Sequence, residues 1–197
     1  SQDEDQLLLI LPSDHLITNE KNFLESIKKA QPAAMDGKIV TFGIKPHNPS
    51  TGFGYIKAKG TFKKDINQPY QIEKFIEKPN KELAEIIFKD DNYSWNSGIF
   101  MAKASILVRE LEFFSPEIIF HCRNSLKNKL DDLDFERLEP ASFGKCPNIS
   151  IDKSIMEKTS LGVVFPLEAD WSDIGSWKSF WEKSSKDKNG NVLIGDS

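Results

Sequence analysis

The apolar positions of the chain fall into short continuous runs and longer helix-spaced patterns. Residues 7–11 are an uninterrupted apolar run, which predicts a strand covered on both faces, as in parallel α/β sheets. After the cap residue Asn19, apolar residues recur at helical spacing until Gly37, which predicts a helix. Residues 38–44 then have strand composition. Strand, helix and strand in this order favour a βαβ unit over an all-β plan.

The remaining chain continues to mix strand and helix patterns. Further strands are predicted after Gly54 and at 71–76, 94–101 and 162–165, and further helices at 81–88, 104–114, 116–126 and around Trp177. Residues 131–147 are weakly patterned, and we assign them no chemistry. A turn at 189–190 precedes what reads as the start of a new strand. At 197 residues, the chain can form one full core, so we expect one α/β domain or a piece of one.

Composition excludes several classes of partner. The formal net charge is -4 and the pI is near 5.5, and no segment is densely basic, so neither nucleic acid nor a membrane surface is an expected partner. Small anionic substrates stay open if a cation or a few lysines offset their charge. The two cysteines have no metal-ligand spacing, which argues against a disulfide framework or a zinc site. A reducing cytoplasm is the expected location.

Two aspartates stand at predicted element ends. Asp14 follows the first strand, where open α/β sheets bind ligands, and Asp173 lies in a short loop before the last predicted helix. Each aspartate alone could equally cap a helix or bind a cation. The pair decides, because two carboxylates at one sheet edge can share a Mg²⁺ ion that also binds substrate phosphates. We therefore predict that Asp14 and Asp173 are metal ligands.

Three further polar or glycine positions carry candidate chemistry. Gly54 ends a glycine-bracketed aromatic segment, where the backbone must either turn or let a group approach closely. Glu77 and Lys78 are adjacent at a strand end, so the pleat predicts that they point apart and do not pair with each other; the alternative is an exposed dipeptide. Asn96 lies inside a predicted strand, where asparagine is disfavoured, which indicates a specific polar contact.

Six motifs together resemble the mannose-1-phosphate guanylyltransferase family, most closely the bacterial form often fused to mannose-6-phosphate isomerase. They are Leu11-Pro12-Ser13-Asp14-His15, Thr51-Gly52-Phe53-Gly54-Tyr55-Ile56, Phe75-Ile76-Glu77-Lys78-Pro79, Trp95-Asn96-Ser97-Gly98-Ile99-Phe100, Ile151-Asp152 through Met156-Glu157-Lys158, and Trp171-Ser172-Asp173-Ile174-Gly175-Ser176-Trp177. Their order and their spread over nearly the whole chain make the resemblance specific.

The resemblance implies a Rossmann-like nucleotidyltransferase fold, similar to the GT-A fold, with a mixed sheet flanked by helices. It implies transfer of GMP from GTP to mannose 1-phosphate, with Mg²⁺ as cofactor and GDP-mannose and pyrophosphate as products. By motif, Asp14, Lys78 and Asp173 are the catalytic residues; the two aspartates bind the metal, and the lysine binds the sugar phosphate. A homo-oligomer is compatible with the resemblance.

The sugar side of the site is carried over in the same way. The backbone of Gly54, behind Phe53, is expected to meet the sugar. Glu77 is expected to accept hydrogen bonds from the sugar hydroxyl groups, Asn96 to make a further sugar contact, and Trp171 to form a wall of the pocket. Asp152 and Glu157 lie inside a family motif, where we expect them to support the site or the fold.

One departure limits what the chain alone should do. The family begins with a glycine-rich signature ending in Thr-Arg-Leu-Trp-Pro and followed by a lysine, which binds the guanine nucleotide; the chain has no such segment. We therefore expect residues 1–188 to be the C-terminal two-thirds of a nucleotidyltransferase domain, incomplete at its N-terminus and inactive alone. Residues 189–197 would begin a following β-helix domain. The alternatives are another hexose-1-phosphate nucleotidyltransferase and a non-catalytic sugar-phosphate-binding homologue.

Overall fold

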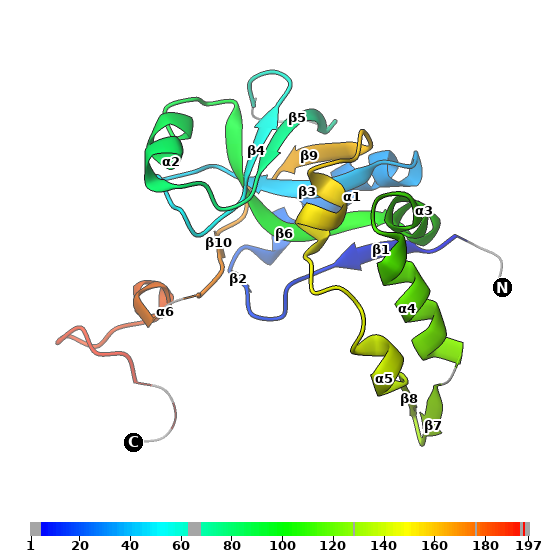
Figure 1. Ribbon diagram of the computed structural model, residues 1–197. Coiled ribbons are helices and arrows are strands. Elements are labelled where there is room, and N and C mark those ends of the chain that lie inside the picture. The colour runs from blue at the N-terminus through cyan, green and yellow to red at the C-terminus, as the bar shows by residue number, and fades with distance from the viewer. Residues whose placement is uncertain (1–4, 63–67, 128, 176, 194, 196–197) are drawn as a thin grey trace.

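A mixed β-sheet forms the centre of the molecule (Figure 1). The computed structural model describes residues 5–62, 68–127, 129–175, 177–193 and 195. In these residues the sheet has six strands in the order β1-β6-β3-β9-β5-β4. The strands are β1 (Leu7–Ile10), β3 (Ile39–Ile44), β4 (Tyr55–Ala58), β5 (Tyr70–Ile76), β6 (Tyr93–Lys103) and β9 (Gly162–Pro166). Among the described strands, only β3 and β9 pair in parallel, so the predicted mixed α/β fold is confirmed.

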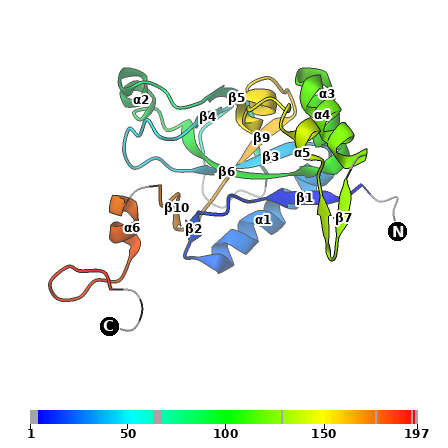
Figure 2. The same cartoon turned by 60° about the horizontal axis from the view of Figure 1, so that its bottom comes forward.

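Helices cover both faces of this sheet (Figure 2). On one face, α1 (Glu20–Met35) places Ala30 and Ala34 against a cluster that includes Phe42 of β3. On the other face, α3 (Ala104–Phe114) and the π-helix η1 (Asp152–Met156) pack Leu107 and Ile155 against the sheet. Each side of β3 is therefore buried, which explains why its side chains are nearly all inaccessible.

Helix boundaries follow the cap signals in the sequence. The side chain of Asn19 accepts a hydrogen bond from the backbone N–H of Asn22 at the start of α1, and Gly37 takes a positive φ of 83° after its end. Asn80 caps α2 (Lys81–Ile87) in the same way. The helices α3 and α4 (Pro116–Lys127) meet at Ser115, as predicted. β1 and β3 both run antiparallel to β6, so they are parallel to each other, with α1 connecting them and β6 inserted between them.

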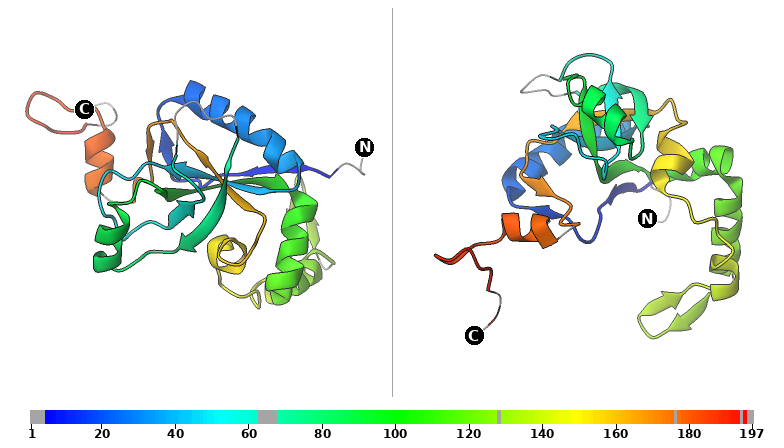
Figure 3. Two further views of the ribbon diagram at one scale, coloured as in Figure 1. Left: turned by 90° about the horizontal axis from the view of Figure 1, so that it is seen from above. Right: turned by 60° about the vertical axis from the view of Figure 1, so that its left-hand side comes forward.

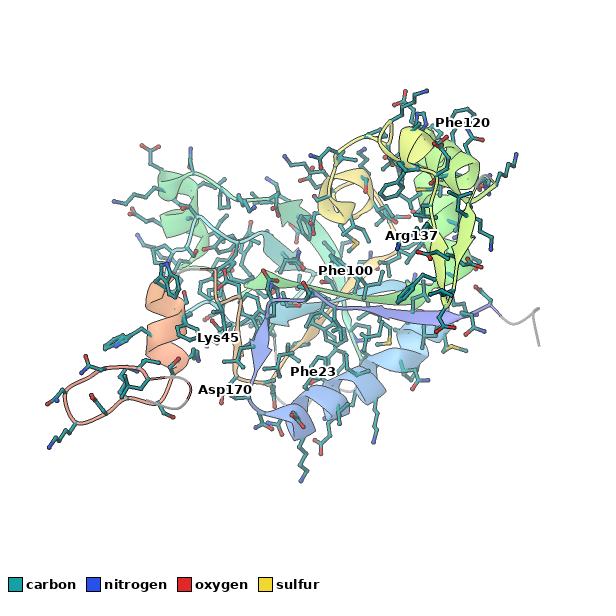
Figure 4. All side chains as sticks on the ribbon, turned by 90° about the horizontal axis from the view of Figure 1, so that it is seen from below. Phe23, Lys45, Phe100, Phe120, Arg137 and Asp170 are labelled. Carbon is teal, nitrogen blue, oxygen red and sulfur yellow. The ribbon has the colours of Figure 1, made fainter. Side chains whose placement is uncertain are left out.

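Two groups of small elements extend from opposite ends of the sheet (Figure 3). One comprises α4, the hairpin β7 (Leu130–Asp132) and β8 (Phe135–Arg137), and α5 (Pro140–Phe143); Phe120 of α4 and Arg137 of β8 are labelled in Figure 4. The other comprises β2 (Leu16–Ile17), β10 (Trp171–Ser172) and α6 (Trp177–Lys183). The turn at 189–190 is confirmed by a bond from Gly190 N–H to the Asp187 carbonyl. The described residues after it, 191–193 and 195, contain no strand.

Residues 7–11 do contain the predicted strand, but the predicted burial of that strand on both faces was wrong. β1 is an edge strand of the described sheet, antiparallel to β6, and not a parallel strand buried on both faces. Its Leu8, Leu9 and Ile10 side chains are 38–39% exposed. A continuous apolar run predicts a strand, but it does not determine which other strands and helices pack against that strand. Across the described residues, none of the helices combines the length and the apolar character that crossing a membrane would require.

Phe42 offers a direct test of the core. Its side chain is fully buried under α1, so Phe42→Ala is expected to lower the free energy of unfolding by about 3–5 kcal/mol, because it leaves a cavity in the core. Phe113→Ala is the matched control, since Phe113 is 75% exposed, and should change that free energy by less than about 0.5 kcal/mol. Urea unfolding measures both. Equal losses in the two variants would contradict this assignment of the core.

Candidate active site

Gly54 brings three of the sequence motifs together. Its carbonyl accepts a hydrogen bond from the backbone N–H of Asn96 at 2.8 Å. A Cβ atom at this position would lie 2.6 Å from Oε2 of Glu77 and 3.5 Å from Cβ of Asn96. Glycine therefore leaves the space that the Glu77 carboxylate occupies. The segments before β4, after β5 and within β6 converge at this point.

The predicted separation of Glu77 and Lys78 was wrong. Nζ of Lys78 lies 3.8 Å from Oε1 of Glu77, so the two side chains form an ion pair. The pleat argument fails because β5 ends at Ile76 and Lys78 has a left-handed φ of 45°, which turns its side chain back toward its neighbour. The lysine side chain is 65% exposed and that of the glutamate is 17% exposed. The amine therefore faces solvent above a mostly buried carboxylate.

The expected polar contact of Asn96 is confirmed, and its partners are now identified. Its Nδ2 donates to Oδ1 of Asp152 at 2.9 Å. Its Oδ1 accepts from Oγ1 of Thr41 at 2.8 Å and from the N–H of Gly98 at 3.3 Å. Sequence reasoning gave Asp152 only a supporting role and did not single out Thr41. The motif that contains Asp152 was a signal, but a threonine inside an ordinary strand pattern offers none.

Two carboxylates and one amine make this cluster electrostatically distinctive. Burial raises the pKa of Asp152 above its ordinary value, against hydrogen bonds that include those from Ser150 and Asn96 and against the charge of Lys78. Burial also raises the pKa of Glu77, and the negative charge of Asp152 adds to the rise while Lys78 opposes it. Such carboxylates are good acceptors for hydroxyl groups, and the exposed amine can meet an anion.

A cavity of about 610 Å³ with several aromatic residues in its wall lies beside Phe53, the residue before Gly54. The Phe53 ring lies 4.7 Å from the ring of Trp95 and 5.4 Å from that of Trp171, measured between centroids. Asp173 and Lys183 also line the cavity. Phe53 and Trp95 line the cavity and directly precede Gly54 and Asn96 of the cluster, so the backbone connects the two sites at both positions. The structure thus places Phe53, Trp171 and Asp173 in the cavity wall.

Strand pairing brings the Asp14 and Asp173 segments together. β2 and β10 are antiparallel, with Trp171 opposite Ile17, and Nε1 of Trp171 donates to Nδ1 of His15 at 3.2 Å. These contacts bring the loop that carries Asp14, just before β2, alongside the segment that leads from β10 to Asp173. His15 was not singled out from the sequence.

Asp14 and Asp173 offer carboxylate oxygens, the donor type that magnesium prefers. A Cβ atom on Gly175 would lie 2.8 Å from Oδ2 of Asp173, so the absence of a side chain at Gly175 provides the space that this carboxylate occupies. No group of three or more His, Cys, Asp or Glu residues in the described chain is arranged to hold a metal ion. Two carboxylates nevertheless suit Mg²⁺, which takes one or two from the protein beside water and substrate phosphates. That Asp14 and Asp173 share one ion stays a prediction.

The raised pKa of Asp152 predicts that its carboxylate lowers stability at neutral pH. The folded state holds this proton more tightly than the unfolded state, so stability falls as pH rises from the ordinary value of 3.8 through the raised pKa. Asp152→Asn should therefore raise the melting temperature at pH 7 and lose this advantage in acid. Asp5 is the opposite control, because hydrogen bonds from Ser105 lower its pKa.

The stability that Asp5 contributes is present above its unfolded pKa and is lost as pH falls through its lowered folded pKa. Asp5→Asn should therefore lower the melting temperature at pH 7. Thermal melts from pH 3 to pH 8 test both variants. A melting temperature that drops in Asp152→Asn at pH 7 would contradict the electrostatic description of the cluster.

Comparisons with known proteins agree on one family. Residues 1–190 match the family model described as Nucleotidyl transferase. Mannose-1-phosphate guanylyltransferase 2 of Escherichia coli O157:H7 is 46% identical over 198 residues, which cover 98% of this chain and 41% of that protein. The chain thus spans about two fifths of the length of the curated relatives it matches. All the candidate site residues, from Asp14 to Asp173, lie within the region that the family model matches.

Two solved structures share the fold. The crystal structure of mannose-6-phosphate isomerase from Helicobacter pylori superposes with a TM-score of 0.77 at 31% identity, covering 86% of this chain and 65% of that one. The crystal structure of mannose-1-phosphate geranyltransferase from Thermus thermophilus gives a TM-score of 0.74 at 26% identity, covering 90% and 49%. The sheet and its flanking helices therefore form an arrangement found in solved structures.

Proposed function

The chain belongs to the nucleotidyl transferase family, and from this premise we propose that the protein containing it transfers GMP from GTP to mannose 1-phosphate. GDP-mannose and pyrophosphate are the products. The observation that carries the proposal is the convergence of Glu77, Asn96 and Asp152 at the Gly54 backbone, with Lys78 paired to Glu77. Extended similarity to proteins named mannose-1-phosphate guanylyltransferase supports the choice of substrates.

The cluster supplies what a sugar phosphate needs. The carboxylates of Glu77 and Asp152 accept hydrogen bonds from hydroxyl groups of the pyranose, and the Gly54 backbone lets the ring approach closely. The exposed amine of Lys78 binds the phosphate through a charge-assisted hydrogen bond. Trp171, beside Phe53, closes the aromatic side of the pocket. Each proposed role is thus assigned to a residue whose charge or hydrogen-bonding type suits it.

The transfer itself moves charge but requires no proton relay. A phosphate oxygen of mannose 1-phosphate attacks the α-phosphorus of GTP, the bond from that phosphorus to the α,β-bridging oxygen breaks, and pyrophosphate leaves with the bonding electrons. The attacking oxygen is already ionised near pH 7, because the second pKa of a phosphate monoester is about 6. Lys78 lowers the repulsion between the two anions and holds the attacking phosphate in line.

Asp14 and Asp173 would hold a magnesium ion at the phosphate side of this site. Their carboxylates come from adjoining loops and leave the remaining coordination positions for water and for substrate oxygens. When bound, the ion supplies positive charge that neutralises the triphosphate and the leaving pyrophosphate. The residues of this chain contribute the two carboxylates, and Lys78 contributes a separate positive charge.

We also infer a cytoplasmic location. The proposed substrates, GTP and a sugar phosphate, are cytoplasmic metabolites. Cys122 and Cys146 are free, partly buried thiols, which fits a reducing compartment.

A product assay tests the proposal. The full product of the gene should form GDP-mannose and an equal amount of pyrophosphate from GTP, mannose 1-phosphate and Mg²⁺, with less product from UTP or from glucose 1-phosphate. Chromatography with mass detection identifies the nucleotide sugar. Residues 1–197 by themselves should give little or no turnover, because they contain no glycine-rich nucleotide signature. A preference for another hexose 1-phosphate, or binding without turnover, would support one of the two alternative functions instead.

A further inference from the structure

A buried threonine lies behind the carboxylate cluster. Thr41 is in β3, at the middle of the sheet, and its side chain is completely inaccessible to solvent. Its hydroxyl contacts two acceptors, Oδ1 of Asn96 at 2.8 Å and the carbonyl of Ile99 at 3.1 Å. Asn96 in turn donates to Asp152. A continuous path of hydrogen bonds therefore runs from the core to the carboxylate of Asp152, whose charge acts on Glu77.

Donor and acceptor types determine how the Asn96 amide is oriented. Its oxygen faces the hydroxyl of Thr41 and the N–H of Gly98, and its nitrogen faces the Asp152 carboxylate. A rotation by 180° would place the amide oxygen against the carboxylate and the amide nitrogen against the Gly98 N–H. Both contacts would be repulsive. The observed orientation is therefore favoured at both ends of the amide.

The hydroxyl of Thr41 provides the shorter of the two bonds that hold the amide oxygen. Without it, that oxygen would keep only the 3.3 Å contact from Gly98, which is weak at this length. Leaving a buried acceptor without a hydrogen-bond partner costs free energy, so loss of the hydroxyl would favour rotation or displacement of the amide. Its bond to Oδ1 of Asp152 would loosen as a result, and the carboxylate would lose one of the contacts that hold it beside Glu77.

We propose that Thr41 is a positioning residue that, through the Asn96 amide, holds Asp152 in the orientation that accepts a sugar hydroxyl. Asp152 contacts the substrate, while Thr41 and the Asn96 amide act through it. The proposal rests on the proposed function, since the ligand is the pyranose of a hexose 1-phosphate. It assigns Asn96 a different role from the direct sugar contact that the family resemblance implies.

Steady-state kinetics of the full gene product provide the first test. Thr41→Val keeps the side-chain shape and removes the hydroxyl, so the KM for mannose 1-phosphate should rise about tenfold while the KM for GTP stays the same. Thr41→Ser restores the hydroxyl and should restore the KM. Ser125→Ala is the matched control, because Ser125 is also fully buried and donates to the carbonyl of Glu139 in the α4–α5 region. It should lower stability without changing either KM.

A double-mutant cycle separates positioning from a general packing effect. In an Asp152→Ala background, Thr41→Val should change the KM for the sugar phosphate by less than about twofold, because the group it positions is gone. An equal effect of Thr41→Val in both backgrounds would overturn the proposal. So would a Thr41→Val enzyme with unchanged KM, or a Thr41→Ser enzyme as impaired as Thr41→Val.

An activity-independent measurement keeps the two proposals distinguishable. In protein labelled with ¹⁵N-asparagine, the side-chain amide signals of Asn96 should shift as Asp152 titrates, and Thr41→Val should reduce that shift. If the wild-type protein turned over no hexose 1-phosphate, the proposed function would fail, and this spectrum would still decide the positioning role. An Asn96 signal that responds to pH identically with and without the Thr41 hydroxyl would refute it.

Discussion

Asp173→Asn is expected to lower kcat/KM for guanylyl transfer by about 100- to 1,000-fold. The change removes one of the two negative charges proposed to bind Mg²⁺ and keeps the shape of the side chain, which fits the space left by Gly175. The Asn variant should also need far more Mg²⁺ to reach half-maximal rate. Loss of charge, and not loss of packing, would then explain the defect.

The shared-ion model makes a further demand on Asp14. Asp14→Asn should show the same defect, and the double variant should be little worse than either single variant, because all three disturb one ion. Asp36→Asn is the control, since this exposed residue follows α1, away from the proposed metal ligands. Magnesium titrations of the initial rate compare these four variants with the wild type. Wild-type Mg²⁺ dependence in Asp173→Asn would remove this residue from the metal site.

Lys78→Ala should have the second large effect, a loss of about 100-fold in kcat/KM. The amine is proposed to bind the sugar phosphate while charge develops during transfer, and no other lysine or arginine forms an ion pair with Glu77 among the described residues. Alanine keeps a Cβ atom, so it carries the same left-handed backbone cost as lysine at φ 45°. The defect would therefore report on the amine.

Variants at neighbouring positions test whether the effect of Lys78→Ala is specific to that lysine. Lys81→Ala removes a similar charge from the start of α2, where the side chain is 84% exposed and pairs only loosely with Glu85 at 4.0 Å; its kinetics should stay close to wild type. Glu77→Gln should raise the KM for mannose 1-phosphate and reduce discrimination against glucose 1-phosphate, because an amide has one acceptor where the carboxylate has two. If Lys78→Ala matched Lys81→Ala in rate, the phosphate contact would be wrong.

Local signals in the sequence predicted the secondary structure well where physical constraints are local. The Asn19 cap and the Ser115-Pro116 junction each satisfy backbone groups within one turn, so the helices begin and end near the expected residues. The surroundings of β1 could not be predicted in this way. Strand order and burial depend on β6, more than 80 residues later in the chain, and an apolar run carries no information on its partner.

In the candidate site, too, features that depend on local sequence could be predicted and features that depend on distant segments could not. Asn96 was identifiable because an asparagine inside a strand needs a partner, whereas Thr41 is an ordinary strand residue whose role appears only when β3 and β6 pair. The ion pair of Glu77 and Lys78 depends on one left-handed residue just beyond β5. Backbone conformation past the end of a strand is not encoded by the alternation within it.

Calorimetric titration of the full gene product with mannose 1-phosphate tests the central claim most directly, because it asks whether the Gly54 cluster is a sugar-phosphate site. The account predicts that the wild-type protein binds mannose 1-phosphate more tightly than glucose 1-phosphate. Lys78→Ala should weaken the binding of both sugar phosphates, and Glu77→Gln should reduce the difference in affinity between them. Binding that is equally strong in the wild type and in both variants would contradict it.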